Sequence, residues 1–400
     1  MPASHRVAIV MKPTPANQVP VVLRMHRLLM LDVCTWRPAG WLPDEFPAGH
    51  SVAWTPDGSR MIVGRQTYGI TVDEPRVVVY DAVTLTPEAG WPFSNDGPSV
   101  QRLAASNTHL CVHFTDNSLQ VYDLGTKSVV ATLPGGNLYI GEICWSPDGS
   151  MLAIAQQSSL AIYDAASWTQ VQGAPTFSTT FSYPYPLAWS PDGSRLAIAQ
   201  RSSGTALRLY DTANWSEIVT GVTHPERPSS IAWTVDGSRI GIGLDADPHL
   251  LVITVPGFVP LAVSMPADAA GGYVTPISML PDGRVVVACN SPRRVSVIAA
   301  DLQSVEQEWL TGAGSEVWSI TASPWLDNTI SGIVLDESEA PAAGRRVIAI
   351  HDASAAVVGT ATTAADGSYS MLSPHADGHT VVLVEDDGRA QALGSGILPL

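Results

Sequence analysis

The fold is decided by the stretch from Leu187 to Ala199, which reads Leu-Ala-Trp-Ser-Pro-Asp-Gly-Ser-Arg-Leu-Ala-Ile-Ala. Both of its ends are apolar enough for short strands, and the Ser-Pro-Asp-Gly-Ser segment between them has the composition of a tight turn. Gly193 can adopt the positive φ that such a turn needs, and Asp192 can hydrogen-bond to the backbone beside it. The stretch therefore predicts a β-hairpin whose first strand ends at Trp189.

Similar hairpins recur at intervals of about 44 residues up to about residue 325. Three copies keep the Trp and the Asp-Gly pair, and they are Trp54 with Asp57 and Gly58, Trp145 with Asp148 and Gly149, and Trp233 with Asp236 and Gly237. A weaker copy has Asp282 and Gly283 after Met279, and two degenerate copies place Ala105 and Ala322 in the Trp position. With the hairpin at Trp189, the repeat has seven units.

Each unit has room for four strands. A third strand ends in Tyr-Asp in several units, as at Tyr163-Asp164 and Tyr210-Asp211, and a fourth follows it. Four strands every 40 to 50 residues or so are the signature of a β-propeller, whereas a helical solenoid would show a 3.6-residue period that is not visible here. We therefore expect an all-β fold that contains a seven-bladed β-propeller.

The two ends of this repeat region are expected to pair. The seventh unit keeps only one strand, Val317–Ser323, whereas Arg6–Val10 and Arg27–Asp32 match the second and third strands of a blade. Pairing the N-terminal strands with the last one would remove the exposed sheet edges. The propeller is thus predicted to occupy residues 1–327 and to be closed by strands from both ends.

The quoted hairpin resembles those of WD-repeat and TolB-type propellers. The resemblance rests on the Trp-Ser-Pro-Asp-Gly-Ser-Arg-Leu-Ala-Ile-Ala segment from Trp189 to Ala199, and its repeats cover about four-fifths of the chain. It implies the fold and is nearly silent on function, because propellers support many activities.

Residues 328–400 follow a different pattern. Alternating strands separated by Gly, Pro and Asp turns predict a small antiparallel sandwich. Ser331–Val334, the later Pro341 and Asp366–Tyr369 resemble the transthyretin-like, or carboxypeptidase-regulatory-like, β-sandwich family, which implies a non-catalytic spacer or docking domain. The segments Pro341–Val347 and Gly394–Leu400 are similar to C-terminal modules of tailed-phage tail proteins.

Composition excludes several classes of partner. The chain has 21 Lys and Arg against 37 Asp and Glu, a formal net charge of −16, and its only lysines are Lys12 and Lys127. A nucleic-acid-binding surface needs a basic stripe, so no nucleic acid partner is expected. No stretch has the length of a transmembrane helix, and no secretory signal is visible, so we expect no membrane insertion. The four cysteines have no metal-type spacing and are predicted to be free thiols.

Signatures of catalysis are absent from the sequence. The nearest approach to a metal site is His109, Cys111 and His113, which share one face of a strand, but an ordinary buried strand is the favoured interpretation. The aspartates of the Pro-Asp-Gly turns and the Trp column are interpreted as structural. We therefore predict no catalytic residue, no cofactor and no metal.

One face of the predicted disc is rich in aromatic residues. In a four-stranded blade, the segment before the Trp strand and the loop between strands two and three emerge opposite the Pro-Asp-Gly turns. Aromatic side chains on an exposed face are typical of protein interfaces and of sugar stacking, although some could simply cover blade junctions. The candidate recognition face consists of Trp41, Phe46, Tyr68, Tyr139, Phe177, Phe181, Tyr183, Tyr185 and Tyr273.

These observations favour a non-enzymatic structural component of a phage virion tail, with the propeller as a platform for protein–protein interaction or host attachment. Its expected partners are other tail proteins and a glycan or receptor of the host surface, within a symmetric assembly. Two alternatives stay open: a soluble bacterial propeller that binds a glycan, a small molecule or a partner protein, and a propeller hydrolase of the lactonase or glycosidase type. Fold alone does not separate the three.

Overall fold

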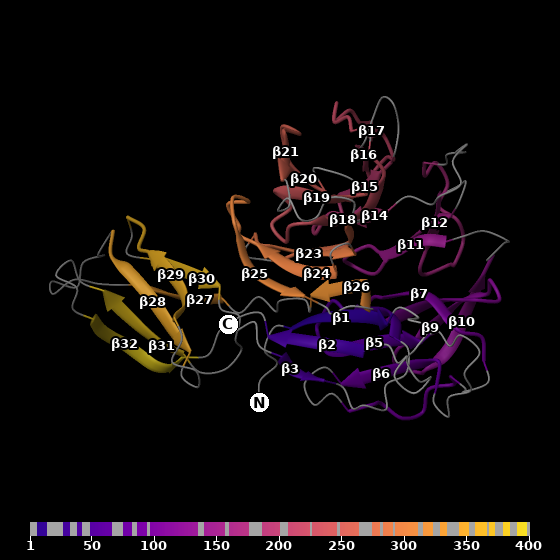
Figure 1. Cartoon of the computed structure of the whole chain (residues 1–400), viewed down its shortest axis with the longest axis horizontal. Helices are drawn as coiled ribbons and strands as arrows, with labels where there is room; N and C mark the ends of the chain where they lie inside the picture. Colours follow the sequence, from indigo (N-terminus) through magenta and orange to yellow (C-terminus); the bar gives the residue numbers. More distant parts are fainter. Residues whose placement is uncertain are drawn as a thin grey trace. The chain divides into compact units, whose positions relative to one another are not determined.

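The computed structural model describes 6–13, 27–32, 38–41, 49–65, 75–81, 86–93, 97–134, 140–156, 160–175, 186–200, 207–224, 226–245, 249–263, 274–280, 283–290, 293–310, 315–322, 329–333, 344–351, 357–365, 368–372, 379–384 and 390–397. All its regular elements in these residues are strands (Figure 1). None of the described residues forms a helix long and apolar enough to span a bilayer.

The chain divides into two compact units. The larger unit comprises residues 7–31 and 38–323, and the smaller one comprises residues 1–6, 32–37 and 324–400. The larger unit contains the hairpin repeats, and the C-terminal module belongs to the smaller one.

Six antiparallel sheets follow one another along the larger unit. In each of them the strands lie side by side in sequence order, as expected for propeller blades. They are β4 (Gly49–Trp54), β5 (Arg60–Arg65) and β6 (Val77–Asp81); β7 (Val100–Ala105), β8 (His109–Phe114), β9 (Leu119–Asp123) and β10 (Ser128–Leu133); β11 (Ile140–Trp145), β12 (Met151–Gln156) and β13 (Leu160–Asp164); β14 (Leu187–Trp189), β15 (Arg195–Ala199), β16 (Leu207–Asp211) and β17 (Glu217–Ile218); β18 (Pro228–Trp233), β19 (Arg239–Leu244), β20 (Leu250–Thr254) and β21 (Pro260–Val263); and β22 (Val274–Met279), β23 (Val285–Asn290), β24 (Arg293–Ile298) and β25 (Val305–Leu310).

A further sheet joins distant parts of the chain, in the order β26-β1-β2-β3. Its strands are β26 (Ser315–Ala322), β1 (Arg6–Pro13), β2 (Arg27–Asp32) and β3 (Pro38–Trp41). The predicted pairing of the two ends is present, with Val7 opposite Ala322 and Ile9 opposite Ile320.

The structure thus shows an all-β propeller with six blades of consecutive strands, whereas the sequence predicted seven. The difference arises because the repeat stops at Ala322. Among the described strands there is no seventh consecutive set, and β26 instead pairs with β1 from the N-terminal segment.

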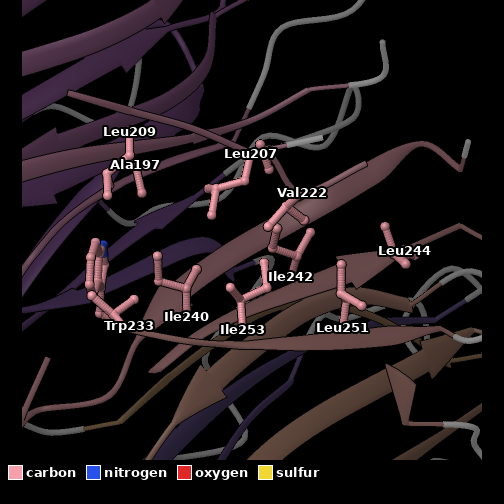
Figure 2. Close-up of a cluster of buried hydrophobic side chains, with 12 residues drawn as sticks. Ala197, Leu207, Leu209, Val222, Trp233, Ile240, Ile242, Leu244, Leu251 and Ile253 are labelled. Carbon is pink, nitrogen blue, oxygen red and sulfur yellow. The ribbon is translucent and has the colours of Figure 1, made fainter. Parts of the chain in front are cut away.

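The hydrophobic core lies between neighbouring blades. In the cluster of Figure 2, Ala197, Leu207 and Leu209 from one blade face Trp233, Ile240 and Ile253 from the next. This arrangement follows from the strand pattern, because a strand buried on both faces by neighbouring sheets must be apolar on both. The inner positions of β15 show it, since Leu196, Ala197, Ile198 and Ala199 are all fully buried.

The smaller unit contains two sheets. β27 (Thr329–Ile333) pairs with β30 (Ser368–Leu372), and the other sheet has the order β29 (Val357–Thr362), β28 (Arg346–His351), β31 (His379–Val384) and β32 (Ala390–Ile397). That these sheets form a transthyretin-like sandwich, with a domain boundary at residues 327 and 328, stays a prediction.

Candidate functional site

The first strand of each blade lies at the inside of the propeller. β4, β7, β11, β14, β18 and β22 each contact the first strand of the next blade, and β26 contacts both β22 and β4. The strands β4, β7, β11, β14, β18 and β22 each lead into a hairpin with the next strand of their own sheet, so one end of the propeller carries these hairpin turns. We call it the turn end. The other end, where the inner strands begin, is called the bulge end because β-bulges lie near the first residues of five inner strands.

At the turn end, the turns that follow β4, β11, β14 and β18 are held by their own polar side chains. After β14, Ser190 Oγ donates to Asp192 Oδ1 at 2.6 Å, and Asp192 Oδ1 also accepts from the Ser194 amide at 3.0 Å. Ser190 Oγ in turn accepts a hydrogen bond from the Arg195 amide at 2.9 Å. Gly193 has a φ of 70°, and its amide donates to the Ser190 carbonyl at 2.9 Å. The carboxylate is thus occupied by the turn itself.

The turns after β4, β11 and β18 repeat this arrangement. The hydroxyl at the strand end belongs to Thr55, Ser146 and Thr234, respectively, and the carboxylate to Asp57, Asp148 and Asp236. The hydrogen bond from that hydroxyl holds the pKa of Asp148, Asp192 and Asp236 below its usual value. The glycines of these turns have positive φ, and they are Gly58 (68°), Gly149 (72°), Gly237 (68°) and, after β22, Gly283 (86°).

The Trp column ties one blade to the next. The indole Nε1 donates to a carbonyl of the preceding inner strand in three cases, namely Trp145 to Ala104 (3.1 Å), Trp189 to Cys144 (3.3 Å) and Trp233 to Ala188 (3.1 Å). The Nε1 of Trp54 is buried without a hydrogen-bond partner. Four consecutive blades, from β7 to β21, are therefore linked by indole hydrogen bonds.

A second aromatic residue supports this column from the turn that follows the third strand of two blades. Trp168 packs edge-on against Trp145, and Trp215 against Trp189, with ring centroids 6.1 Å apart in both pairs. Both residues have positive φ, 56° and 59°. Where the inner strand has Met279 instead of Trp, an aliphatic residue, Leu302, belongs to the same buried cluster. The side chains at the turn end therefore serve to stabilise the fold.

The bulge end differs from the turn end in its backbone. A β-bulge interrupts the pairing of five inner strands near their first residues, in β4, β7, β11, β18 and β22. Bulges redirect side chains and are over-represented beside active sites. In four of these strands the residue after the bulge is polar, and these residues are Ser51, Arg102, Glu142 and Ser230.

Arg102 and Glu142 lie on the neighbouring inner strands β7 and β11. Arg102 Nε donates to the Gly141 carbonyl at 3.1 Å, which holds the guanidinium against β11. Burial raises the pKa of Glu142, while the charge of Arg102 and a hydrogen bond from the Ile143 amide act in the opposite direction. The two side chains are partly exposed, and no ion pair joins them in the part of the chain that the structure describes.

His113 lies directly opposite Arg102 in the register of β7 and β8, so the two side chains share one face of the sheet. It is fully buried, and neither ring nitrogen has a hydrogen-bond partner. Burial and, to a lesser extent, the charge of Arg102 lower the pKa of His113 to about 4. Two more buried polar atoms at this end also have no partner, Ser230 Oγ and His249 Nδ1.

The residues considered for a metal do not form a metal site. His109 stacks on Trp145 at 5.7 Å, and its Nδ1 is 2.9 Å from Thr108 Oγ1. Cys111 is fully buried, and burial raises the pKa of its thiol, so it is not a thiolate ligand or nucleophile at neutral pH. Among the described residues, no group of three or more His, Cys, Asp or Glu is arranged to hold a metal ion.

The predicted recognition face falls outside the described residues, with one exception. Trp41 is the last residue of β3, where the structure describes the backbone. The residues not described are Phe46, Tyr68, Tyr139, Phe177, Phe181, Tyr183, Tyr185 and Tyr273, and the same holds for Asp282 of the turn motif. The face predicted to carry these aromatic residues is nevertheless the bulge end.

Arg102 and Glu142 were missed by reasoning from the sequence. The available signal was their position, three residues before the Trp column, at Ala105 and Trp145. Most residues of the inner strands are apolar, and only 14% of the chain is charged, so two opposite charges in the same position of consecutive repeats were informative. The bulges that redirect them could not be read from the repeat.

The comparisons bear on the fold. No known family model matches the chain. A chain of the solved structure titled "Crystal Structure of Mitotic Checkpoint Complex" is similar with a TM-score of 0.51 and 17% identity, over 70% of this chain and 90% of that one. The fold is a β-propeller. At this level of identity the similarity shows the fold alone, and the function has to be argued from the site.

Proposed function

We propose that this WD-repeat-like propeller is a non-enzymatic, protein-binding scaffold whose recognition face is the bulge end. The observation that carries the proposal is the contrast between the two ends. At the turn end, the carboxylates and hydroxyls are bonded to their own turns. At the bulge end, Arg102 and Glu142 are partly exposed and form no ion pair within the described part of the chain, where buried polar atoms of His113 and Ser230 also lack hydrogen-bond partners. Natural proteins keep such groups mainly where function requires them.

The test compares one substitution at each end. Arg102→Glu reverses a charge at the bulge end, and Arg195→Glu does the same at the start of β15, at the turn end. Both proteins serve as bait beside the unmodified chain, with folding checked by circular dichroism. We expect a partner captured by the unmodified chain and by the Arg195 variant to be lost from the Arg102 variant. Equal capture by all three proteins would refute the assignment of the bulge end.

We further propose that the sheet β26-β1-β2-β3 is a seventh blade that closes the ring. Support comes from the contacts of β26, which touches β22 on one side and β4 on the other, as the other inner strands touch their neighbours. This sheet also has four strands, the same number as a complete blade. Averaged electron-microscopy images viewed along the propeller axis should show seven lobes, and six lobes would contradict closure by this sheet.

The more specific proposal of a phage-tail component rests on the C-terminal module, which we take to be a transthyretin-like sandwich that docks the propeller. Its support is the similarity of Pro341–Val347 and Gly394–Leu400 to modules of tail proteins, together with two sheets of antiparallel strands in this region. Quantitative mass spectrometry of purified virions from a candidate phage should find the chain in fixed stoichiometry with tail proteins. Its absence from virions would exclude the tail assignment and leave the scaffold proposal standing.

A further inference from the structure

Two opposite charges at the bulge end are held near each other without neutralising each other. Arg102 and Glu142 occupy the same position of consecutive blades, directly after the bulges of β7 and β11. The charge of Arg102 lowers the pKa of Glu142 against the raising effect of burial, but no ion pair forms between the two side chains in the described part of the chain. Because the two side chains do not form an ion pair with each other, Arg102 can bind an anionic group of a ligand and Glu142 a cationic one.

The hydrogen bonds of Arg102 leave one nitrogen available. Its Nε is bonded to the Gly141 carbonyl at 3.1 Å, and its Nη1 lies 3.4 Å from the Gln101 carbonyl. Among the described residues, Nη2 of Arg102 has no hydrogen-bond partner. Because a guanidinium bound through Nε has a fixed plane, its remaining N–H groups point in a defined direction and suit a carboxylate.

His113 is the independent second sign of a ligand site. It lies opposite Arg102 on the same face of the sheet, it is fully buried, and both of its ring nitrogens lack partners. Leaving a buried polar group without a hydrogen bond destabilises the folded state. An apolar residue would pack at lower cost in this position, so a histidine kept there marks this face of the sheet as one where function outweighs stability.

On these grounds, and resting on the proposed role of the bulge end, we infer that Arg102 and Glu142 bind a small zwitterion of the α-amino acid class, beside the buried His113. Such a ligand carries a carboxylate for Arg102 and an ammonium group for Glu142, a few ångströms apart. A simple anion would be attracted by Arg102 and repelled by Glu142, and the reverse would hold for a simple cation. Two residues further along the same strands stand Ala104 in β7 and Cys144 in β11. Neither of them adds a charge beside Arg102 and Glu142.

The inference can be tested by isothermal titration calorimetry with the whole chain. The probes are the individual proteinogenic amino acids, with acetate and methylammonium as single-charge controls, each at concentrations up to about 10 mM, which detects a Kd of about 1 mM. We expect at least one amino acid to bind, and both single-charge compounds to bind at least tenfold more weakly. If no amino acid binds, the inference is wrong, whereas capture of a protein partner at the bulge end is unaffected.

Three variants make the site assignment specific. Arg102→Gln and Glu142→Gln are each expected to weaken amino acid binding by at least tenfold, which corresponds to about 1.4 kcal/mol. Arg195→Gln, the same change at the turn end, should leave binding unchanged. Circular dichroism checks that each variant is folded. Undiminished binding by either bulge-end variant would overturn the inference, and so would acetate binding as tight as that of the amino acid.

Discussion

The hydroxyl in front of each Pro-Asp-Gly turn has two hydrogen-bonding tasks, and its loss should be measurable. Ser190 donates to Asp192 and accepts from the Arg195 amide, so Ser190→Ala removes both bonds. We expect the free energy of unfolding to fall by about 1–2 kcal/mol in urea titrations at pH 7. Since the bond from Ser190 lowers the pKa of Asp192, the contribution of this carboxylate is present above pH 3.8 and is lost as pH falls through its folded-state value. The difference between the two proteins should therefore shrink at pH 3.

His113 should make the protein sensitive to acid. Its pKa is about 4 in the folded protein against 6.5 in the unfolded chain, so the unfolded state takes up the proton first. The free energy of unfolding therefore decreases as the pH falls from 6.5 to 4, and the total decrease due to His113 is on the order of 3 kcal/mol. His113→Leu should remove this loss, so its urea midpoint should exceed that of the unmodified protein most clearly at pH 4 to 5. A pH dependence identical in both proteins would show that His113 does not carry it.

Two tryptophans in the same position of the repeat provide a matched pair for measuring the indole hydrogen bond. Trp189 Nε1 bonds to the Cys144 carbonyl at 3.3 Å, whereas Trp54 Nε1 is buried with no partner. Both side chains are equally buried, at 7% exposure, so Phe substitution removes similar packing from each. Trp189→Phe should therefore destabilise the protein by about 1 kcal/mol more than Trp54→Phe, as measured by urea unfolding. Equal effects would mean that the indole hydrogen bond adds nothing to the junction.

Much of the fold could be predicted from these elements because the deciding signals are local. A Ser-Pro-Asp-Gly-Ser segment after a short apolar strand specifies its own turn, and the pairing of Arg6–Val10 with the strand ending at Ala322 followed from counting strands. The candidate site was harder to predict. Its positions depend on bulges in β7 and β11, and a bulge depends on register across two strands rather than on any residue type.

For the whole larger unit, the N-terminal strand should matter more than the C-terminal module. β1 is paired with β26 over most of its length, from Val7 to Pro13, and both belong to the larger unit. Deleting residues 1–13 should lower the thermal midpoint of the propeller strongly, because it leaves the inner strand β26 without a pairing neighbour. Deleting residues 324–400, which lie in the smaller unit, should leave that midpoint nearly unchanged. Circular dichroism melting distinguishes the two, and a cooperative, unshifted transition without β1 would contradict the role assigned to it.

The indole bonds divide the propeller unevenly, since they join the four blades from β7 to β21, and the described residues show none on either side of these blades. If the molecule is pulled apart by its ends, as happens to proteins built into long filaments or held between two moving bodies, resistance will not be uniform. The outlying blades should peel away first under small forces, and the bonded arc should give way last. The chain would then extend in two stages, and the four blades from β7 to β21 would stay folded during the first stage.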